Sequence, residues 1–395
     1  MKKAFKEYGA CSDFEGCCDV HDEEEINDAE EDDYLLEPVE MDTDRSILLP
    51  FHICCVSHTI SLICTTDASK VADDDYKKMS GSVFSKCGKL WKMSGRPKAA
   101  KIILDKIGKQ LTLPCVTRWN SLYNSILVLL ECKANLNKLM TELKLTPFTN
   151  NELQFLEEYA RVMKPLADAL DRLQAENDTY FGVVLPSLLA VESKLRKLEL
   201  GDLTYCKSLV QEVLKGLNKR FHSFLTLSMD PVCKLAIVSS ISNPRFKLKW
   251  LRIKNEFNNI ETKTKVLQLF DEALKREVVR KDKEPENFVA EQEAYDQFFD
   301  YEPSKFDDAK PSLENDIQKL SYLDEDTSVY LESLHRFPVV KRIFMRYNTP
   351  IPSSAPVERL FSFAGHVHSP RRNRLGDDTF RTLVLMKANS SLLAK

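Results

Sequence analysis

The sequence contains no apolar stretch long enough to cross a bilayer, and its first residues, MKKAFKEYG, lack the apolar segment of a secretory signal. It also contains no Gly-rich phosphate-binding loop and no internal repeat. The eleven cysteines are odd in number and show no regular framework spacing. These absences argue against a membrane-spanning or disulfide-built protein, so we expect an intracellular chain with reduced thiols.

Charge is distributed unevenly along the 395 residues. The segment from Asp13 to Asp44 contains sixteen Asp and Glu and no Lys or Arg, so its formal charge is −16. Because the net charge of the whole chain is −4, the remaining residues together carry +12. Such a segment is predicted to be a disordered acidic loop, either a plain surface insertion or, alternatively, a mimic of nucleic acid or a chaperone-like tail. The basic remainder suits a nucleic-acid partner, although solvated Lys and Arg faces produce the same excess.

Apolar residues recur every three or four positions along most of the chain, and this spacing predicts a mainly α protein. We read these stripes as core and assign no cofactor to them. The charged, proline-containing region 280–311 is predicted to be a flexible linker. The expected helices cover residues 120–143, 153–173, 188–200, 206–225 and 262–279, with further helical order over 325–347.

The stretch from Ser353 to Asn389 combines two helical patterns with a basic loop between them. A serine cap and a proline in the first turn begin the first helix, and its apolar residues fall on one face. Gly365 is predicted to end this helix, and Gly376 to precede the second. The apolar residues of the two helices are Val357, Leu360, Phe361, Ala364, Phe380, Leu383, Val384 and Met386.

This stretch resembles the C-terminal dimerisation region of hAT-superfamily transposases and of the domesticated proteins derived from them. The resemblance rests on a long ordered motif rather than on apolar spacing, which alone would indicate only a buried helix. The matching residues are Ser354, Ala355, Glu358, Arg359, Phe361, Ser362, Ala364 and Gly365, then Arg371, Arg372, Arg374 and Leu375, and then Leu383 to Asn389.

The resemblance implies a large helical insertion domain flanked by partial segments of an RNase H-like α/β core. Residues 1–12 would be a remnant of that core, followed by the acidic loop at 13–47. The helical insertion would span 48–279 and the linker 280–311. Residues 312–395 would form the dimerisation region that completes the core. The chain would self-associate as a homodimer or higher oligomer through Val357, Leu360, Phe361, Phe380, Leu383 and Val384.

Two further motifs match the same family. Cys55 and His58 form a Cys-x-x-His pair, which is half of a zinc site; because no second pair lies at a suitable spacing, we expect a structural role and no metal. Arg118 and Trp119 match an Arg-Trp pair that lies near the transposon end in the family. An indole can stack on an unpaired base beside a phosphate-binding guanidinium, but it can equally be a half-buried anchor for the next helix.

The resemblance also implies which residues would bind DNA. With Arg118 and Trp119, the loop residues Arg371, Arg372 and Arg374 are the candidate DNA-binding groups. The segment NPRFKLKWL, residues 243–251, resembles another family element; it is read as a solvated cationic face, with an irregular phosphate-binding edge as the alternative.

hAT transposases cut DNA with two Asp and one Glu that hold two divalent metal ions. The Glu corresponds to Glu358, and both Asp positions would fall before residue 1, so Glu358 is expected to be vestigial and the chain not to be an enzyme. We therefore expect a transposase-derived, non-catalytic nuclear protein that dimerises, with DNA as a further candidate partner. It would need no cofactor, membrane or small-molecule substrate. The alternative is a fragment of an active transposase, which would use Mg²⁺ or Mn²⁺.

Overall fold

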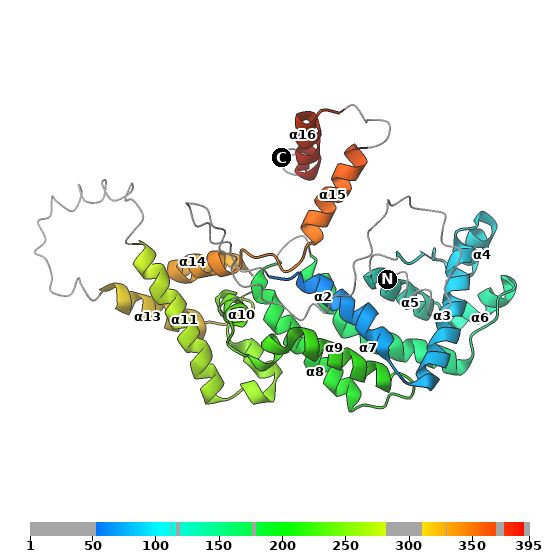
Figure 1. Cartoon of the computed structure of the whole chain (residues 1–395), viewed down its shortest axis with the longest axis horizontal. Helices are drawn as coiled ribbons and strands as arrows, with labels where there is room; N and C mark the ends of the chain where they lie inside the picture. The colour runs from blue at the N-terminus through cyan, green and yellow to red at the C-terminus, as the bar shows by residue number, and fades with distance from the viewer. Residues whose placement is uncertain are drawn as a thin grey trace, which may run out of the picture. The chain divides into compact units, whose positions relative to one another are not determined.

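The computed structural model describes residues 53–111, 113–115, 119–175, 179–281, 310–328, 330–368 and 375–390. Every regular element in these ranges is helical (Figure 1). The predicted mainly α class is therefore confirmed. The α/β core segments expected at the two ends are not seen among these residues. Every regular element described within 330–390 is a helix, and residues 1–12 lie outside the described ranges.

Two compact units make up the fold, and each is built from segments that are distant in sequence. The first contains residues up to 179, 194–220 and 352 onward, and the second contains 180–193 and 221–351. The expected domain limits at residues 12, 47, 279 and 311 stay a prediction.

The described part of the first unit begins with a short helix that continues into single turns of π- and 3-10-helix. Its longest helix, α7, is held at its start by a capping box in which Thr149 and Glu152 exchange hydrogen bonds. Phe155 and Tyr159 of α7 pack on Tyr76 and Phe84 of α3 with ring centroids 5.6 and 5.1 Å apart. The helices of this unit are α2 (Val56–Leu62), α3 (Asp74–Ser94), α4 (Pro97–Ile107), α5 (Trp119–Glu131), α6 (Lys133–Glu142), α7 (Asn150–Leu173), α15 (Ala355–Val367) and α16 (Asp377–Ala388).

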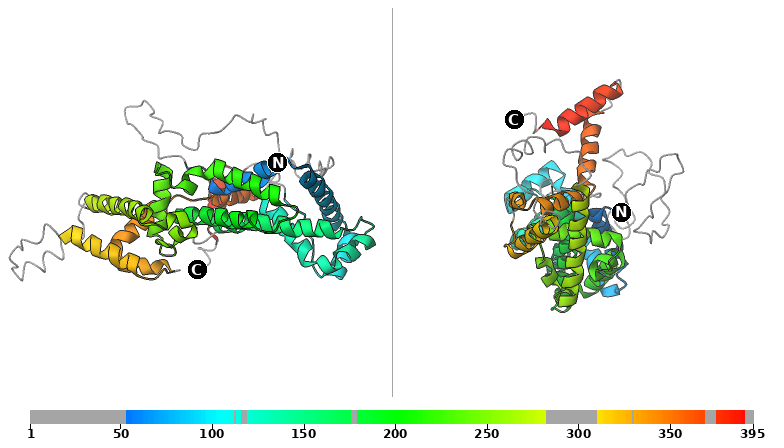
Figure 2. Two further views of the ribbon diagram at one scale, coloured as in Figure 1. Left: turned by 90° about the horizontal axis from the view of Figure 1, so that it is seen from below. Right: turned by 90° about the vertical axis from the view of Figure 1, so that its left-hand side faces the viewer.

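The second unit is built around α10, which is buried on most of its circumference. Figure 2 shows α11, α13 and α14 lying side by side in yellow and orange. Two helices are shared between the units, since the boundaries fall within α8 (Val184–Glu199) and α9 (Lys207–Thr226). The remaining elements are η3 (Phe181–Val183), α10 (Pro231–Ser242), η4 (Lys249–Ile253), η5 (Asn255–Phe257), α11 (Ile260–Lys281), α13 (Lys310–Asp324), η7 (Leu331–Arg336) and α14 (Pro338–Tyr347).

The predicted helix over 120–143 is two helices, because α5 ends at Glu131 and α6 begins at Lys133. Gly365 does not end α15, which continues to Val367. The linker expected over 280–311 lies largely outside the described residues.

Four cysteines, Cys64, Cys87, Cys206 and Cys233, are buried free thiols within the helical cores. Burial raises the thiol pKa of the first three, and it raises the pKa of Cys233 to about 11. These thiols are therefore protonated near neutral pH and act as small apolar core residues.

A buried ion pair lies where α9 packs in the first unit. The carboxylate of Asp67 accepts hydrogen bonds from Arg220 Nε at 2.6 Å and Nη2 at 3.2 Å, and from Lys70 Nζ at 3.0 Å. Burial by itself raises the pKa of Asp67, but the hydrogen bonds from Arg220 and Lys70 outweigh it and hold the pKa below the usual 3.8. At Gly216 a Cβ would lie 2.7 Å from the Asp67 carboxylate, so this site requires glycine.

We expect Asp67→Asn to destabilise the protein by about 3 kcal/mol at pH 7, because it removes the charge from a largely buried carboxylate that pairs with Arg220. Since the folded pKa of Asp67 is lowered, its stabilisation is fully present above the unfolded pKa and is lost as the pH falls through the folded pKa. The difference between wild type and variant in urea midpoint should therefore shrink below about pH 4. The exposed Asp202→Asn is the control; a difference for Asp67→Asn that stays constant with pH would contradict the prediction.

Candidate functional site

The start of α15 is fastened to the start of α2. Val56 N donates to Pro352 O at 3.0 Å, and Ser354 N donates to Cys55 Sγ at 3.2 Å. Cys55 is also the N-cap of α2, since its sulfur accepts the N–H of His58 at 3.4 Å. The side chain of His58 is exposed. The Cys-x-x-His motif and the Ser354 motif, about 300 residues apart in sequence, thus meet through a cysteine that caps one helix and positions the next.

Helices α15 and α16 form a hairpin in which α16 folds back beside α15 (Figure 1). Val367 and Val384 are buried in it, and the rings of His368 and Phe380 meet edge to face with centroids 5.9 Å apart. The ammonium of Lys387 lies 5.9 Å from the ring of Phe363, within cation–π range.

Several large apolar side chains of this hairpin are exposed. The exposed fractions are 50% for Val357, 37% for Leu360 and 70% for Phe361. On α16, Leu385 is 48% and Met386 is 54% exposed. We call these five residues the apolar face of the hairpin.

Some predicted dimerisation residues are not on this face. Val384 is 8% exposed, and Phe380 and Leu383 are half-buried, so they contribute mainly to the hairpin itself. Leu385 and Met386 are exposed but are not among the predicted dimerisation residues. Helical spacing identifies a stripe, but the side of α16 that packs on α15 is decided by tertiary contact.

Glu358 lies in the first turn of α15 and is exposed. Its carboxylate accepts the hydroxyl of Ser354 at 2.6 Å, and this position near a helix N-terminus favours a negative charge. Within the described ranges, no group of three or more His, Cys, Asp or Glu side chains is arranged to hold a metal ion. The hydrogen bond from Ser354 gives Glu358 a local role at the start of α15.

The predicted DNA-binding residues cannot be described structurally as a set. Arg118, Arg371, Arg372 and Arg374 lie outside the described residues, and Trp119 is placed only as the first residue of α5. Their role stays a prediction.

The NPRFKLKWL segment is not simply a solvated cationic face. Lys247 is 4% exposed and its ammonium donates to the carbonyls of Tyr322, Glu325 and Asp326 at 2.6, 2.9 and 3.2 Å. Burial lowers the pKa of Lys247, although Glu325 and Asp326 oppose the shift. Lys247 thus satisfies carbonyl groups at the end of α13, a use that alternating charge in the sequence does not reveal.

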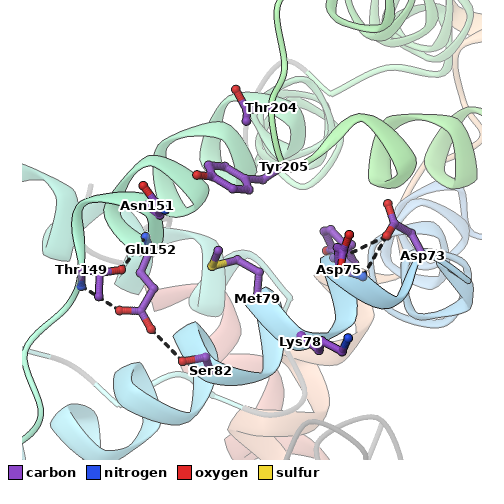
Figure 3. Close-up of a pocket in the computed structure, with 11 residues that line it drawn as sticks. Asp73, Asp75, Lys78, Met79, Ser82, Thr149, Asn151, Glu152, Thr204 and Tyr205 are labelled. Carbon is purple, nitrogen blue, oxygen red and sulfur yellow. Dashed lines mark hydrogen bonds between the residues drawn. The ribbon is translucent and has the colours of Figure 1, made fainter.

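An open hollow of about 670 Å³ lies beside the first turns of α3 and α7 (Figure 3). Asp73 accepts the backbone N–H groups of Asp75 and Tyr76, and Glu152 accepts that of Thr149 as well as the hydroxyl of Ser82. Because side-chain carboxylates already take these helix-terminal donors, the hollow offers no free anion site and we assign it no ligand.

At the neighbouring start of α9, the 1% exposed Glu158 accepts the N–H groups of Thr204, Tyr205 and Cys206 at 3.0, 2.8 and 3.1 Å. Three backbone donors on one carboxylate fix the entry of α9 against α7. Glu158 is a structural cap that helical spacing alone did not identify.

Comparison with known proteins adds no family to this geometry. No protein-family model matches the chain, and no curated protein matches it significantly. The resemblance to hAT transposases therefore rests on the motifs given above. No single helix among the described residues is long and apolar enough to span a membrane, although α9 and α10, bent by 67° at their junction, pass that test as a pair.

Proposed function

We propose that this protein is a non-catalytic, transposase-derived protein that self-associates through the α15–α16 hairpin. The observation that carries the proposal is the apolar face of the hairpin, where Phe361 is 70% exposed. Burying such side chains against a partner stabilises association by about 25 cal/mol for each Å² of apolar surface removed from water. Contiguous exposed apolar side chains are typical of protein interaction sites.

A second copy of the same chain is the partner that the hairpin suits best. The exposed charged groups of the hairpin carry both signs: Glu358, Asp377 and Asp378 are acidic, and Arg381 and Lys387 are basic. A patch with both charges can pair with its own copy across a two-fold axis, because each acidic group can meet a basic group of the other copy. The motif resemblance points to the same partner.

The remaining parts of the proposal follow from the motif resemblance. The hairpin would descend from the end of an RNase H-like core, the protein would reside in the nucleus, and DNA would be a further partner through Arg118, Trp119 and the basic loop at Arg371 to Arg374. Sedimentation velocity of the purified chain tests self-association. We expect a dimer or higher oligomer that dissociates on dilution; a monomer at all micromolar concentrations would overturn the proposal.

A test for DNA cleavage distinguishes this proposal from that of an active transposase. We expect no nicking of supercoiled plasmid by the chain in Mg²⁺ or Mn²⁺, because Glu358 is the one matched member of the Asp/Asp/Glu set and two metal ions need more than one carboxylate. Glu358→Ala is the control. Nicking that is present in the wild type and abolished by Glu358→Ala would show that the chain is catalytic.

A further inference from the structure

The helices α3 and α4 belong to a strongly basic stretch of the chain. Between Tyr76 and Leu130 there are eleven Lys and Arg and one acidic residue, Asp105. This excess is larger than solvated surface helices need, since such helices usually mix charges of both signs. Apart from Arg118 and Trp119, the stretch contains none of the residues to which DNA binding was assigned above.

Five of these cations gather at the turn between the two helices. Lys89 and Lys92 lie one turn apart near the end of α3, Arg96 is the residue before α4, and Lys98 and Lys101 lie one turn apart in the first half of α4. All five side chains are exposed. We call these residues the basic turn.

The basic turn has no acidic partners within the part of the chain that the structure describes, since none of its five cations forms an ion pair. Cations elsewhere on the same elements do form ion pairs. Lys86 meets Glu152 at 2.6 Å, and Lys106 near the end of α4 meets Glu142 at 2.9 Å. Among the described residues, cations without an ion pair therefore gather at the turn between α3 and α4, where repulsion among them costs stability that a bound anion would recover.

The scaffold under the basic turn is ordered. Leu90, Trp91 and Ile103 are buried on the inner side of the helices, and α3 and α4 pack on each other (Figure 1). The hydroxyl of Ser94 donates to Trp91 O at 2.7 Å at the end of α3. The cations are therefore presented from fixed backbone positions, so less conformational entropy is lost on binding a ligand.

The chemistry of this surface favours a nucleic acid. A membrane-surface helix exposes an apolar stripe beside its cations. In contrast, α3 buries most of its apolar side chains, and on α4 one large apolar side chain, Leu104, is exposed. A row of phosphates offers several closely spaced negative charges to several lysines at once. We propose that the basic turn binds the phosphate backbone of a nucleic acid without reading its sequence.

The proposal is independent of self-association, because the basic turn shares no residue with the α15–α16 hairpin. Its test is the triple variant Lys89→Gln, Lys92→Gln and Arg96→Gln in the full chain. The matched control, Lys263→Gln, Lys275→Gln and Arg276→Gln, removes the same charge from exposed positions of α11. Gln has a helix propensity close to that of Lys and Arg, so both variants should fold, which circular dichroism verifies.

Binding to a labelled DNA duplex of about 20 base pairs is followed by fluorescence anisotropy between about 50 and 200 mM salt. We expect the basic-turn variant to bind about tenfold or more weakly and to lose about 2 to 3 from the slope of log K against log salt, since each phosphate contact contributes about 0.9. The affinity of the α11 variant for the duplex should remain within about twofold of that of the wild type. Equal loss in the two variants, or no loss in the basic-turn variant, would overturn the assignment. Equally tight binding of polyglutamate would overturn it too, because the surface would then be a general acceptor of acidic chains.

Discussion

Replacing Phe361 with aspartate is expected to raise the dimer dissociation constant at least about thirtyfold, a change of about 2 kcal/mol typical of a central interface residue. Phe361 is the most exposed large apolar residue of the α15–α16 hairpin. In a dimer it would be buried, and a carboxylate at that position would be desolvated without a partner. Because the side chain is already exposed in the single chain, the substitution should leave folding unchanged.

Sedimentation velocity over a range of protein concentrations measures the effect. Leu200→Asp is the matched control, because Leu200 is 89% exposed just after α8 and is not part of the hairpin. We expect the control to associate as the wild type does. If both variants weakened association equally, or if Phe361→Asp had no effect, the apolar face would not be the interface.

Among substitutions that add a single methyl group, Gly182→Ala is expected to lower stability the most. A Cβ at this position would lie 2.4 Å from the carbonyl oxygen of Ser239 and 2.8 Å from Oδ1 of Asn348. That same Oδ1 accepts the Gly182 N–H at 2.7 Å, and Ser240 donates to the Gly182 carbonyl at 3.0 Å. The atom nearest to the added Cβ is the backbone carbonyl oxygen of Ser239, which cannot rotate away, so α10 and η3 would have to move apart. We expect Gly182→Ala to destabilise the second unit by about 3 kcal/mol.

Peptide-resolved hydrogen exchange is the suitable measurement, because a chain with two compact units need not unfold in a single transition. Protection should fall in α10 and α14. Gly88→Ala is the control: nothing lies within 4 Å of a Cβ there, and alanine should stabilise α3 by about 0.5 to 1 kcal/mol. Unchanged protection of α10 in Gly182→Ala would show that the backbone relaxes at little cost.

Much of the helical structure was predictable. The spacing of apolar residues identified α7, α8, α9 and α11 to within a few residues at most of their ends, because each helix buries one side and the pattern records that side. The division of 120–143 into α5 and α6 was not predictable in this way, since a helix break at Cys132 leaves the apolar spacing intact. The continuation of α15 past Gly365 was missed because glycine permits a helix end without requiring one.

Buried charges were the least predictable part. Lys247 was read as one cation of a solvated face, yet its ammonium lies among the carbonyls that follow α13. Glu158 and Asp67 are likewise buried, one capping α9 and the other paired with Arg220. Their partners are about 45 to 155 residues away in sequence, so no local pattern indicates the contact.

The sequence by itself determined that this chain is helical, because an apolar residue at every third or fourth position can be buried only by a helix. It also determined where charge accumulates, since composition does not depend on folding. Tertiary structure alone decided which apolar face is covered: the stripe of α7 is core, whereas Phe361 on an equally regular stripe of α15 is exposed. The physical reason is that periodicity defines a face but not its neighbour, which depends on contacts between distant segments such as that of Cys55 with Ser354.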